Sequence, residues 1–222
     1  MGKEGPYKSP EIKLRRGVNT TVRFVAFLDI MGFKDRVARN PHDEILSSLT
    51  NLSSFISSII DKNENIFYTM FSDSLIFYTL NDKLTTFKQL CKTLNKVIIK
   101  SISLGIPIKG AIAKGEFTAD IAKLLYFGQP LIDAYLLEES LLSYNIIIHH
   151  SLESICKQND IKHLILDVNT PLRGGNSNHF ILDTYGADLE NNRKAIMNIR
   201  ETVSDSPRRY IDNTLHLLPK KA

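Results

Sequence analysis

The sequence predicts an α+β domain of the ferredoxin-like kind, in which helices pack on an antiparallel-rich sheet. Apolar runs rich in β-branched residues alternate along the chain with segments whose apolar residues recur at three- and four-residue steps. The apolar run over residues 65–80 is interrupted in its middle by Ser72-Asp73, which indicates a hairpin. The resulting order is strand, helix, hairpin, helix, strand, helix, strand, and that order predicts this class of fold.

The first half of the chain supplies a strand, the hairpin and three helices. Residues 22–30 (VRFVAFLDI) form an apolar, β-rich run and predict a buried strand. Gly32-Phe33 turns the chain into a helix that Pro41 interrupts. Two further segments show the helical spacing of apolar residues, over 43–60 and 84–104.

The second half begins with a strand that Pro107 opens and that ends near Phe117. Residues 118–128 predict a loop, and Pro130 suits the first turn of a helix that runs to about Leu142. The remaining predicted elements are strands over 145–149, 162–168 and 179–183, a short helix over 151–158 and a turn-rich loop over 173–178.

The chain divides into three predicted parts. Residues 1–20 begin with a polar, basic stretch that contains glycine and proline, and they predict a flexible N-terminal segment. Residues 21–185 carry the α+β domain with all of its predicted strands. Residues 186–222 are polar and predict a mostly helical C-terminal extension.

Composition narrows the class of protein. The 222 residues carry a net charge of only +4, which gives no reason to expect nucleic acid as a partner. The two cysteines, Cys91 and Cys156, fit a reducing compartment and form no CxxC metal spacing. No apolar run approaches the roughly 18 residues that a membrane helix needs, and the N-terminus lacks the apolar region of a signal peptide. We therefore expect a cytoplasmic protein without a membrane partner.

Two aspartates stand at the edges of apolar, strand-like runs. Asp29 ends the first predicted strand, and Asp73 lies at the bend of the predicted hairpin. An ionised carboxylate in such surroundings is costly unless it is paired or binds a cation. If the first strand and the hairpin are neighbours in the sheet, the two carboxylates converge in an oxygen-rich pocket that suits Mg²⁺ or Mn²⁺. Alternatively, Asp29 is a helix N-cap and Asp73 a turn residue.

The residues after Asp29 suggest a phosphate contact beside this pocket. Gly32 allows a sharp turn, which leaves backbone N–H groups near the helix N-terminus to receive phosphate. Phe33 is expected to lock that turn into the core.

Four segments, in order, resemble motifs of the class III nucleotide cyclases. Asp29-Ile30-Met31-Gly32-Phe33 resembles the first metal motif of that family, and Ser72-Asp73 resembles the hairpin that bears its second metal aspartate. The segment 109–115 resembles a strand in which a basic residue is followed six positions on by glycine. The segment 127–138 resembles the family's Gly-x-x-Val-Asn-x-Ala-x-Arg-hydrophobic-Glu helix. The order and spacing hold over residues 22 to about 160.

This resemblance implies a site and a reaction. Two Mn²⁺ or Mg²⁺ ions would be held by Asp29, Asp73 and the Ile30 carbonyl, and Lys109 would contact phosphate. The ribose 3′-hydroxyl of a nucleoside triphosphate would attack its own α-phosphate, releasing pyrophosphate and leaving a 3′,5′-cyclic nucleotide. The family also implies a homodimer in which each site is shared between two subunits. Lys114 is a second basic candidate, without a motif match.

Four positions depart from the family pattern. The family's transition-state asparagine and arginine fall on Ile132 and Leu136, and its purine-reading lysine and aspartate fall on Thr69 and Leu125. The sequence is more similar to the pyrimidine cyclases of bacterial Pycsar anti-phage defence. This resemblance implies that Thr69 and Leu125 line a narrower pocket, which suits a smaller base. That resemblance implies UTP, ahead of CTP, as substrate, and a cyclic nucleotide messenger that acts on a separate effector.

Two other functions remain open. Loss of the asparagine and arginine favours a catalytically degenerate, cyclase-like nucleotide-binding module. A palm-type nucleotidyltransferase would share the sheet and the two aspartates. Among the other polar groups, Arg173-Gly174-Gly175 predicts a turn rather than a phosphate contact. His149 and His150 are expected to point to opposite faces of a strand, so they would not share a metal ion.

Overall fold

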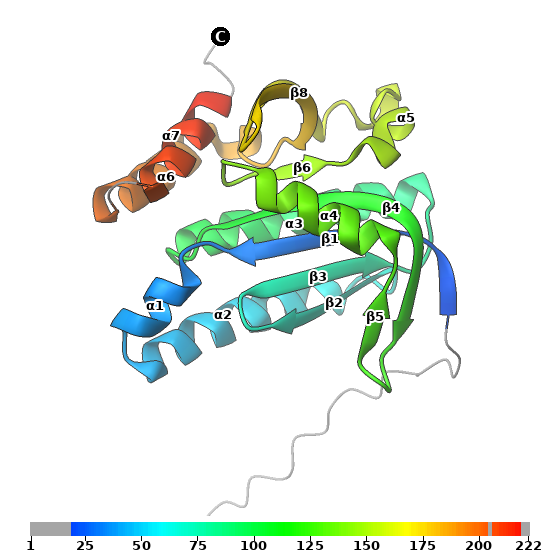
Figure 1. Ribbon diagram of the computed structural model, residues 1–222, viewed down its shortest axis with the longest axis horizontal. Helices are drawn as coiled ribbons and strands as arrows, with labels where there is room; N and C mark the ends of the chain where they lie inside the picture. Colours follow the sequence, from blue (N-terminus) through cyan, green and yellow to red (C-terminus); the bar gives the residue numbers. More distant parts are fainter. Residues whose placement is uncertain (1–18, 204–205, 219–222) are drawn as a thin grey trace, which may run out of the picture.

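A single sheet organises the molecule in the computed structural model, which describes residues 19–203 and 206–218 (Figure 1). The sheet has eight strands in the order β2-β3-β1-β4-β6-β8-β7, and β5 pairs with β4 off this path. The strands are β1 (Asn19–Ile30), β2 (Ile66–Phe71), β3 (Ser74–Thr79), β4 (Ile108–Asp120), β5 (Leu125–Phe127), β6 (Ile146–Ile148), β7 (Ile165–Leu172) and β8 (Gly175–Leu182). Residues 1–18 of the predicted N-terminal segment 1–20 lie outside the described residues.

Helices cover both faces of this sheet (Figure 1). The helices are α1 (Phe33–Arg39), α2 (His42–Ile60), α3 (Leu84–Ser103), α4 (Gln129–Ser140), α5 (Glu153–Cys156), α6 (Leu189–Thr202) and α7 (Ser206–Leu217). Within the two described ranges, no helix combines the length and the apolar character that a membrane crossing requires. The predicted α+β fold, with an antiparallel-rich sheet and helices packed on it, is confirmed.

Successive side chains of β1 point to opposite faces of the sheet, so they pack against different helices. Phe24 and Leu28 pack in the large core that α2 and α3 complete. Phe27 packs with Ala134 of α4, on the opposite face. Asp29, two residues beyond Phe27, therefore faces α4.

The predicted loop over 118–128 is wrong. Strand β4 continues to Asp120, and β5 turns back along it with Thr118 opposite Phe127. Several apolar residues of this hairpin, among them Leu124, Leu125 and Phe127, are exposed, so the pattern does not follow the core spacing from which strands are predicted. At the end of β5, Gly128 has a positive φ of 152°, and a Cβ there would overlap the Glu116 carbonyl oxygen.

The predicted turn-rich loop over 173–178 is also shorter than expected. Strand β7 extends to Leu172 and β8 already begins at Gly175, so only two residues form the turn. Most of the first half of β8 is exposed to solvent. Its glycine, serine and asparagine side chains therefore suit a paired strand, although their composition is typical of a loop.

Within the range predicted as a C-terminal extension, the described residues 186–203 and 206–218 consist mainly of α6 and α7. The two helices are joined by an ion pair between Arg200 and Asp212, with 2.7 Å between Nε and Oδ1. Helix α6 packs against α3 through Ile196 and Ile199. Helix α7 lies beside the segment that joins α4 to β6. Figure 1 shows α7 on the side of the sheet at which the arrow of β1 ends.

Candidate active site

The two predicted metal-binding aspartates lie at one end of the sheet. Asp29 is the penultimate residue of β1 and pairs with Ser74, the first residue of β3. Asp73 precedes Ser74 in the turn of the β2–β3 hairpin, and its carbonyl oxygen accepts the Ile30 N–H at 2.9 Å. The expected neighbourhood of the first strand and the hairpin is therefore confirmed, and it brings the two acidic residues together.

The hairpin turn has a strained residue directly before Asp73. Ser72 has φ 57°, in the left-handed region that costs a non-glycine residue about 1 kcal/mol. The turn nevertheless places Asp73 next to the end of β1. Gly32, after Asp29, also has a positive φ of 71° and precedes α1, while Phe33 packs on the main core as expected.

Asp29 carries a poorly compensated charge. Partial burial, together with repulsion from Glu138 and Asp73, raises the pKa of Asp29 from its ordinary 3.8 to about 7, although Lys109 acts in the lowering direction. A carboxylate in this position resists ionisation unless a cation is added. The donor set therefore fits a hard divalent cation.

Lys109 is enclosed within the protein. It lies opposite Asp29 in the β1–β4 ladder, and its ammonium is 2.9 Å from Glu138 Oε1. The same ammonium donates to the Glu138 carbonyl oxygen at 2.6 Å. Only 3% of Lys109 is exposed. A phosphate contact would require Lys109 to leave Glu138, so in this arrangement its charge mainly compensates that buried carboxylate.

A cleft of about 270 Å³ opens beside Asp29. It is lined by Phe27, Asp29, Met31, Ser74, Lys109, Tyr135, Glu138, Glu139, Arg173 and Tyr210. Arg173 is the more accessible cation, because 57% of its side chain is exposed and it pairs with Glu139 at 2.8 Å. The interpretation of Arg173 as a turn residue is correct but incomplete, because the turn between β7 and β8 reaches the cleft.

Two carboxylates alone do not complete a metal shell. Within residues 19–203 and 206–218, no group of three or more histidine, cysteine, aspartate or glutamate side chains is placed to hold a metal ion. Mg²⁺ commonly uses one or two protein carboxylates and takes its other ligands from water and substrate phosphates. Asp29 and Asp73 fit that mode of binding, with the Ile30 carbonyl as the further ligand that the sequence predicts.

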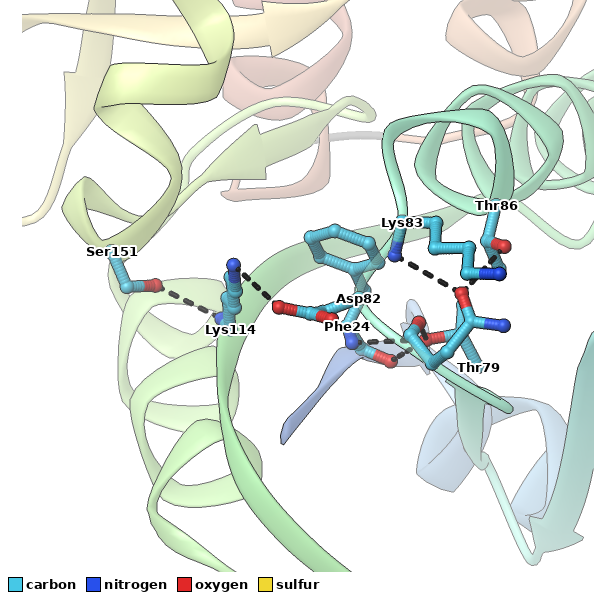
Figure 2. A network of polar contacts seen from close by, with 8 residues as sticks. Phe24, Thr79, Asp82, Lys83, Thr86, Lys114 and Ser151 are labelled. Atoms are coloured by element: carbon cyan, nitrogen blue, oxygen red, sulfur yellow. Dashed lines mark hydrogen bonds and ion pairs between the residues drawn. The ribbon is translucent and has the colours of Figure 1, made fainter. Parts of the chain in front are cut away.

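Lys114, the second basic candidate, lies away from the cleft. It is five residues beyond Lys109 on β4, so its side chain points to the opposite face of the sheet. Figure 2 shows the Lys114 ammonium paired with Asp82, at 3.0 Å, and the backbone N–H of Lys114 donating to the Ser151 hydroxyl oxygen. Lys114 therefore ties β4 to the loop before α3 and to the turn after β6.

The two adjacent histidines are closer together than the sequence predicts. Strand β6 ends at Ile148, and His150 begins a short 3₁₀ turn. The rings of His149 and His150 consequently lie 3.9 Å apart, centroid to centroid, rather than on opposite faces. They belong to a different cleft from Asp29.

Solved structures with the same arrangement of elements are nucleotide cyclase domains. The catalytic core of a rhodopsin-guanylyl cyclase with converted specificity, in complex with ATPalphaS, matches with a TM-score of 0.57 and 17% identity, over 73% of this chain and 95% of that chain. The guanylate cyclase domain of RhGC from Catenaria anguillulae, in complex with GTP, gives a TM-score of 0.55 and 16% identity, over 72% and 95%. For the adenylyl cyclase CyaB from P. aeruginosa these values are 0.55 and 16%, over 75% and 94%. This chain has the fold of a nucleotide cyclase catalytic domain.

The sequence matches no protein-family model and no curated protein. The likeness in the cyclase fold is thus a likeness of structure at low sequence identity.

Within this cyclase fold, the two predicted base-contacting residues lie apart. Thr69 is on β2 opposite Ile76, two residues along β3 from the partner of Asp29. Leu125 pairs with Asp120, which is 11 residues beyond Lys109 on β4, roughly 36 Å at about 3.3 Å per residue. One protomer therefore does not bring Leu125 to Asp29.

Apolar side chains are exposed where the cyclase family has its asparagine and arginine. On α4, Ile132 and Leu136 are 53% and 57% exposed. The adjacent β4–β5 hairpin exposes Leu124, Leu125 and Phe127. We refer to these five exposed apolar residues, on α4 and on the hairpin directly before it, as the α4–hairpin surface.

Proposed function

We propose that the protein is a metal-dependent nucleotide cyclase, which converts a nucleoside triphosphate to a 3′,5′-cyclic monophosphate and pyrophosphate. The convergence of Asp29 and Asp73 at one end of a cyclase-type sheet carries this proposal. The same likeness favours a cyclase over the palm-type nucleotidyltransferase that the two aspartates also allowed.

The residues in and beside the cleft have distinct roles in this proposal. Asp29, Asp73 and the Ile30 carbonyl hold two Mn²⁺ or Mg²⁺ ions. Such ions, when bound, neutralise phosphate charge and lower the pKa of the attacking ribose hydroxyl. Arg173 binds the triphosphate, since its guanidinium is exposed and lines the cleft. Lys109 compensates the buried carboxylate of Glu138, which lies in the same cleft. Gly32 and Phe33 shape the turn that follows Asp29.

A homodimer completes the site. The α4–hairpin surface is an unusual concentration of exposed apolar residues, which is typical of a protein–protein interface. Leu125 and Asp29 lie at opposite ends of one protomer, so a shared base-binding pocket requires a second copy. We infer that each site takes its metal ligands from one subunit and its base contacts from the other.

A pyrimidine triphosphate is the substrate we favour, with UTP ahead of CTP. Neither Thr69 nor Leu125 carries the charge with which the family's lysine and aspartate read a purine. A short polar and an apolar side chain at these positions leave a pocket without those purine contacts. The product would be a second messenger for a separate effector, as in the Pycsar anti-phage systems that the sequence resembles.

Substitution of the two aspartates tests the proposed function. D29N and D73N should each lower conversion of triphosphate by about a hundredfold or more, because a ligand of the charge-neutralising ions is lost. D35N, in the exposed first turn of α1, is the matched control and should retain activity. EDTA should abolish turnover, and added Mn²⁺ should restore it. Full activity of either aspartate variant would exclude this site.

A degenerate nucleotide-binding module is the second candidate. The observation in its favour is that the family's transition-state asparagine and arginine are replaced by the exposed Ile132 and Leu136. Such a module would bind a triphosphate, with Mn²⁺, without consuming it. Calorimetric titration with a non-hydrolysable triphosphate, set beside the turnover assay, separates the two functions.

A further inference from the structure

Helix α7 reaches the candidate active site from the predicted C-terminal extension. Tyr210, in the middle of α7, lines the same cleft as Asp29 and Lys109. No motif of the sequence points to Tyr210, because it is separated from both residues by the whole second half of the chain. Its placement follows from the way α7 is attached to the sheet.

Direct hydrogen bonds fix the position of α7. The Thr214 hydroxyl oxygen accepts the Tyr144 N–H at 2.7 Å. The Asn213 side-chain amide donates to the Leu142 carbonyl oxygen at 2.8 Å. The rings of Tyr144 and Tyr210 stack, with 5.9 Å between centroids and 14° between planes. Helix α7 is therefore anchored to the segment that joins α4 to β6.

The anchored ring of Tyr210 faces the buried ammonium of Lys109. The Lys109 Nζ lies 5.8 Å from the centroid of the ring, within the range of a cation–π contact. The carboxylate and the carbonyl oxygen of Glu138 provide the polar partners of the same ammonium. Such a contact gains strength when the cation is removed from water, as it is here.

We propose that Tyr210 is a positioning residue of the candidate active site, whose ring shields the Lys109 ammonium and keeps it on Glu138. The charges of both Lys109 and Glu138 act on Asp29, so the positions of these two side chains affect how readily this proposed metal ligand ionises. The C-terminal helix is thus part of the catalytic unit rather than an appended segment. The catalytic meaning of this inference rests on the proposed function, whereas the shielding of Lys109 does not.

Amine acetylation of the full-length protein tests the shielding without reference to activity. The rate of modification of Lys109 is measured by peptide mass spectrometry in wild type, Y210A, Y210F and R209A. Lys109 should be acetylated about tenfold faster in Y210A, because the loss of the ring exposes it through local opening. Y210F should restore wild-type protection, and R209A, an exposed neighbour on α7, should not change it.

Lys114 is the internal reference for this experiment. Its side chain is 27% exposed and lies on the other face of β4, so its rate should be the same in every variant. Equal acetylation of Lys109 in wild type and Y210A would overturn the inference, and so would parallel increases at Lys109 and Lys114. If Y210A does not fold, Y210L carries the test, because it keeps apolar bulk without an aromatic face. Wild-type protection of Lys109 in Y210L would then refute the proposal.

Turnover supplies the second readout. If the protein is a cyclase, Y210A should lower kcat by about tenfold with little change in KM. A loss of about tenfold is typical when a residue that supports a metal ligand from behind is removed. Y210F should recover kcat. If Lys109 is acetylated faster in Y210A but kcat is unchanged, the positioning role is rejected. Absence of turnover in the wild type would instead reject the proposed function and leave the acetylation result standing.

Discussion

At the scale of single residues, the half-buried carboxylate of Asp29 is the feature that most needs a ligand. Burial and the neighbouring Glu138 and Asp73 raise the pKa of Asp29 to about 7, and Lys109 offsets only part of that effect. The folded protein thus tolerates an ionised Asp29 at a cost in stability. A divalent cation would remove that cost, so Asp29 links stability, metal binding and the proposed chemistry.

D29N should stabilise the metal-free protein at pH 8. Because the folded-state pKa of about 7 lies above the ordinary value of 3.8, the folded protein binds more protons, and its stability falls as the pH rises through this window. Asparagine does not titrate and avoids that loss. In EDTA at pH 8, D29N should therefore melt at a higher temperature than the wild type. Mn²⁺ should raise the melting temperature of the wild type and of D35N, but not that of D29N; equal shifts in all three would contradict metal binding by Asp29.

The Lys109–Glu138 pair should behave as a buried ion pair. K109M removes one partner and leaves a buried carboxylate uncompensated, which should lower the free energy of unfolding by about 3–5 kcal/mol. The double variant K109M/E138Q should recover most of that loss, since no unpaired charge remains. Urea unfolding measures both effects, with K92M on the exposed side of α3 as the control. A K109M variant as stable as K92M would show that the pair is not formed.

The two kinds of site residue differ in how far the sequence could predict them. Asp29 and Asp73 are candidates from sequence alone, because a carboxylate at the end of an apolar strand or at a hairpin bend stands out in its local context. Arg173 and Tyr210 could not be predicted as site residues, because a turn between β7 and β8 and a helix after the last strand reach the cleft only through tertiary packing. For Lys109, the motif marked the position, but the partner that encloses it lies 29 residues away on α4.

At the scale of elements, α4 has two different faces. Its buried side carries Ala134 and Glu138 toward the sheet. Its other side exposes Ile132 and Leu136. Because apolar residues lie on both sides of the helix, its sequence has little amphipathic character, and Pro130 and the motif indicate the helix instead. The exposed apolar residues have no role in the core of one protomer, which is why we assign them to an interface.

L136D should weaken the proposed homodimer. A carboxylate placed at the centre of an apolar interface must be desolvated without a partner, and this cost opposes association. Sedimentation should show wild type as a dimer and L136D as a monomer at the same concentration. L46D is the matched control, since Leu46 is 54% exposed on α2 and away from the α4–hairpin surface. Identical sedimentation of wild type and L136D would contradict an interface at α4.

The hairpin of β4 and β5 shows where element prediction fails. Helices and buried strands follow the periodicity of apolar residues, and that signal predicts α2, α3 and β1 to within a few residues of their observed bounds. The β4–β5 hairpin instead depends on backbone pairing beyond the core, with apolar residues that face solvent. The exposed apolar residues of this hairpin therefore indicate a protein–protein interface, and they do not follow the pattern that predicts a strand.

At the scale of the whole molecule, the order of strands and helices predicts the fold class, although that order lacks β5 and several predicted ends differ from the observed ones. The order of elements alone does not fix the neighbours of β1. In the structure β3 pairs antiparallel with β1, and this pairing brings Asp29 and Asp73 to one end of the sheet. The three-strand extension β6-β8-β7 and the return of α7 to the site depend on long-range packing that no local pattern encodes. Helix α7 thus lines one side of the candidate site through Tyr210.

The most direct test of the central claim is product analysis. The purified full-length protein is incubated with ATP, GTP, CTP and UTP separately in the presence of Mn²⁺, and the products are resolved by chromatography and mass spectrometry. We predict a 3′,5′-cyclic monophosphate and pyrophosphate from UTP, with less from CTP, and no product from D29N. A cyclic purine nucleotide alone would contradict the assigned substrate. Absence of any cyclic product from all four triphosphates, with the protein folded and Mn²⁺ bound, would contradict the assignment as a cyclase.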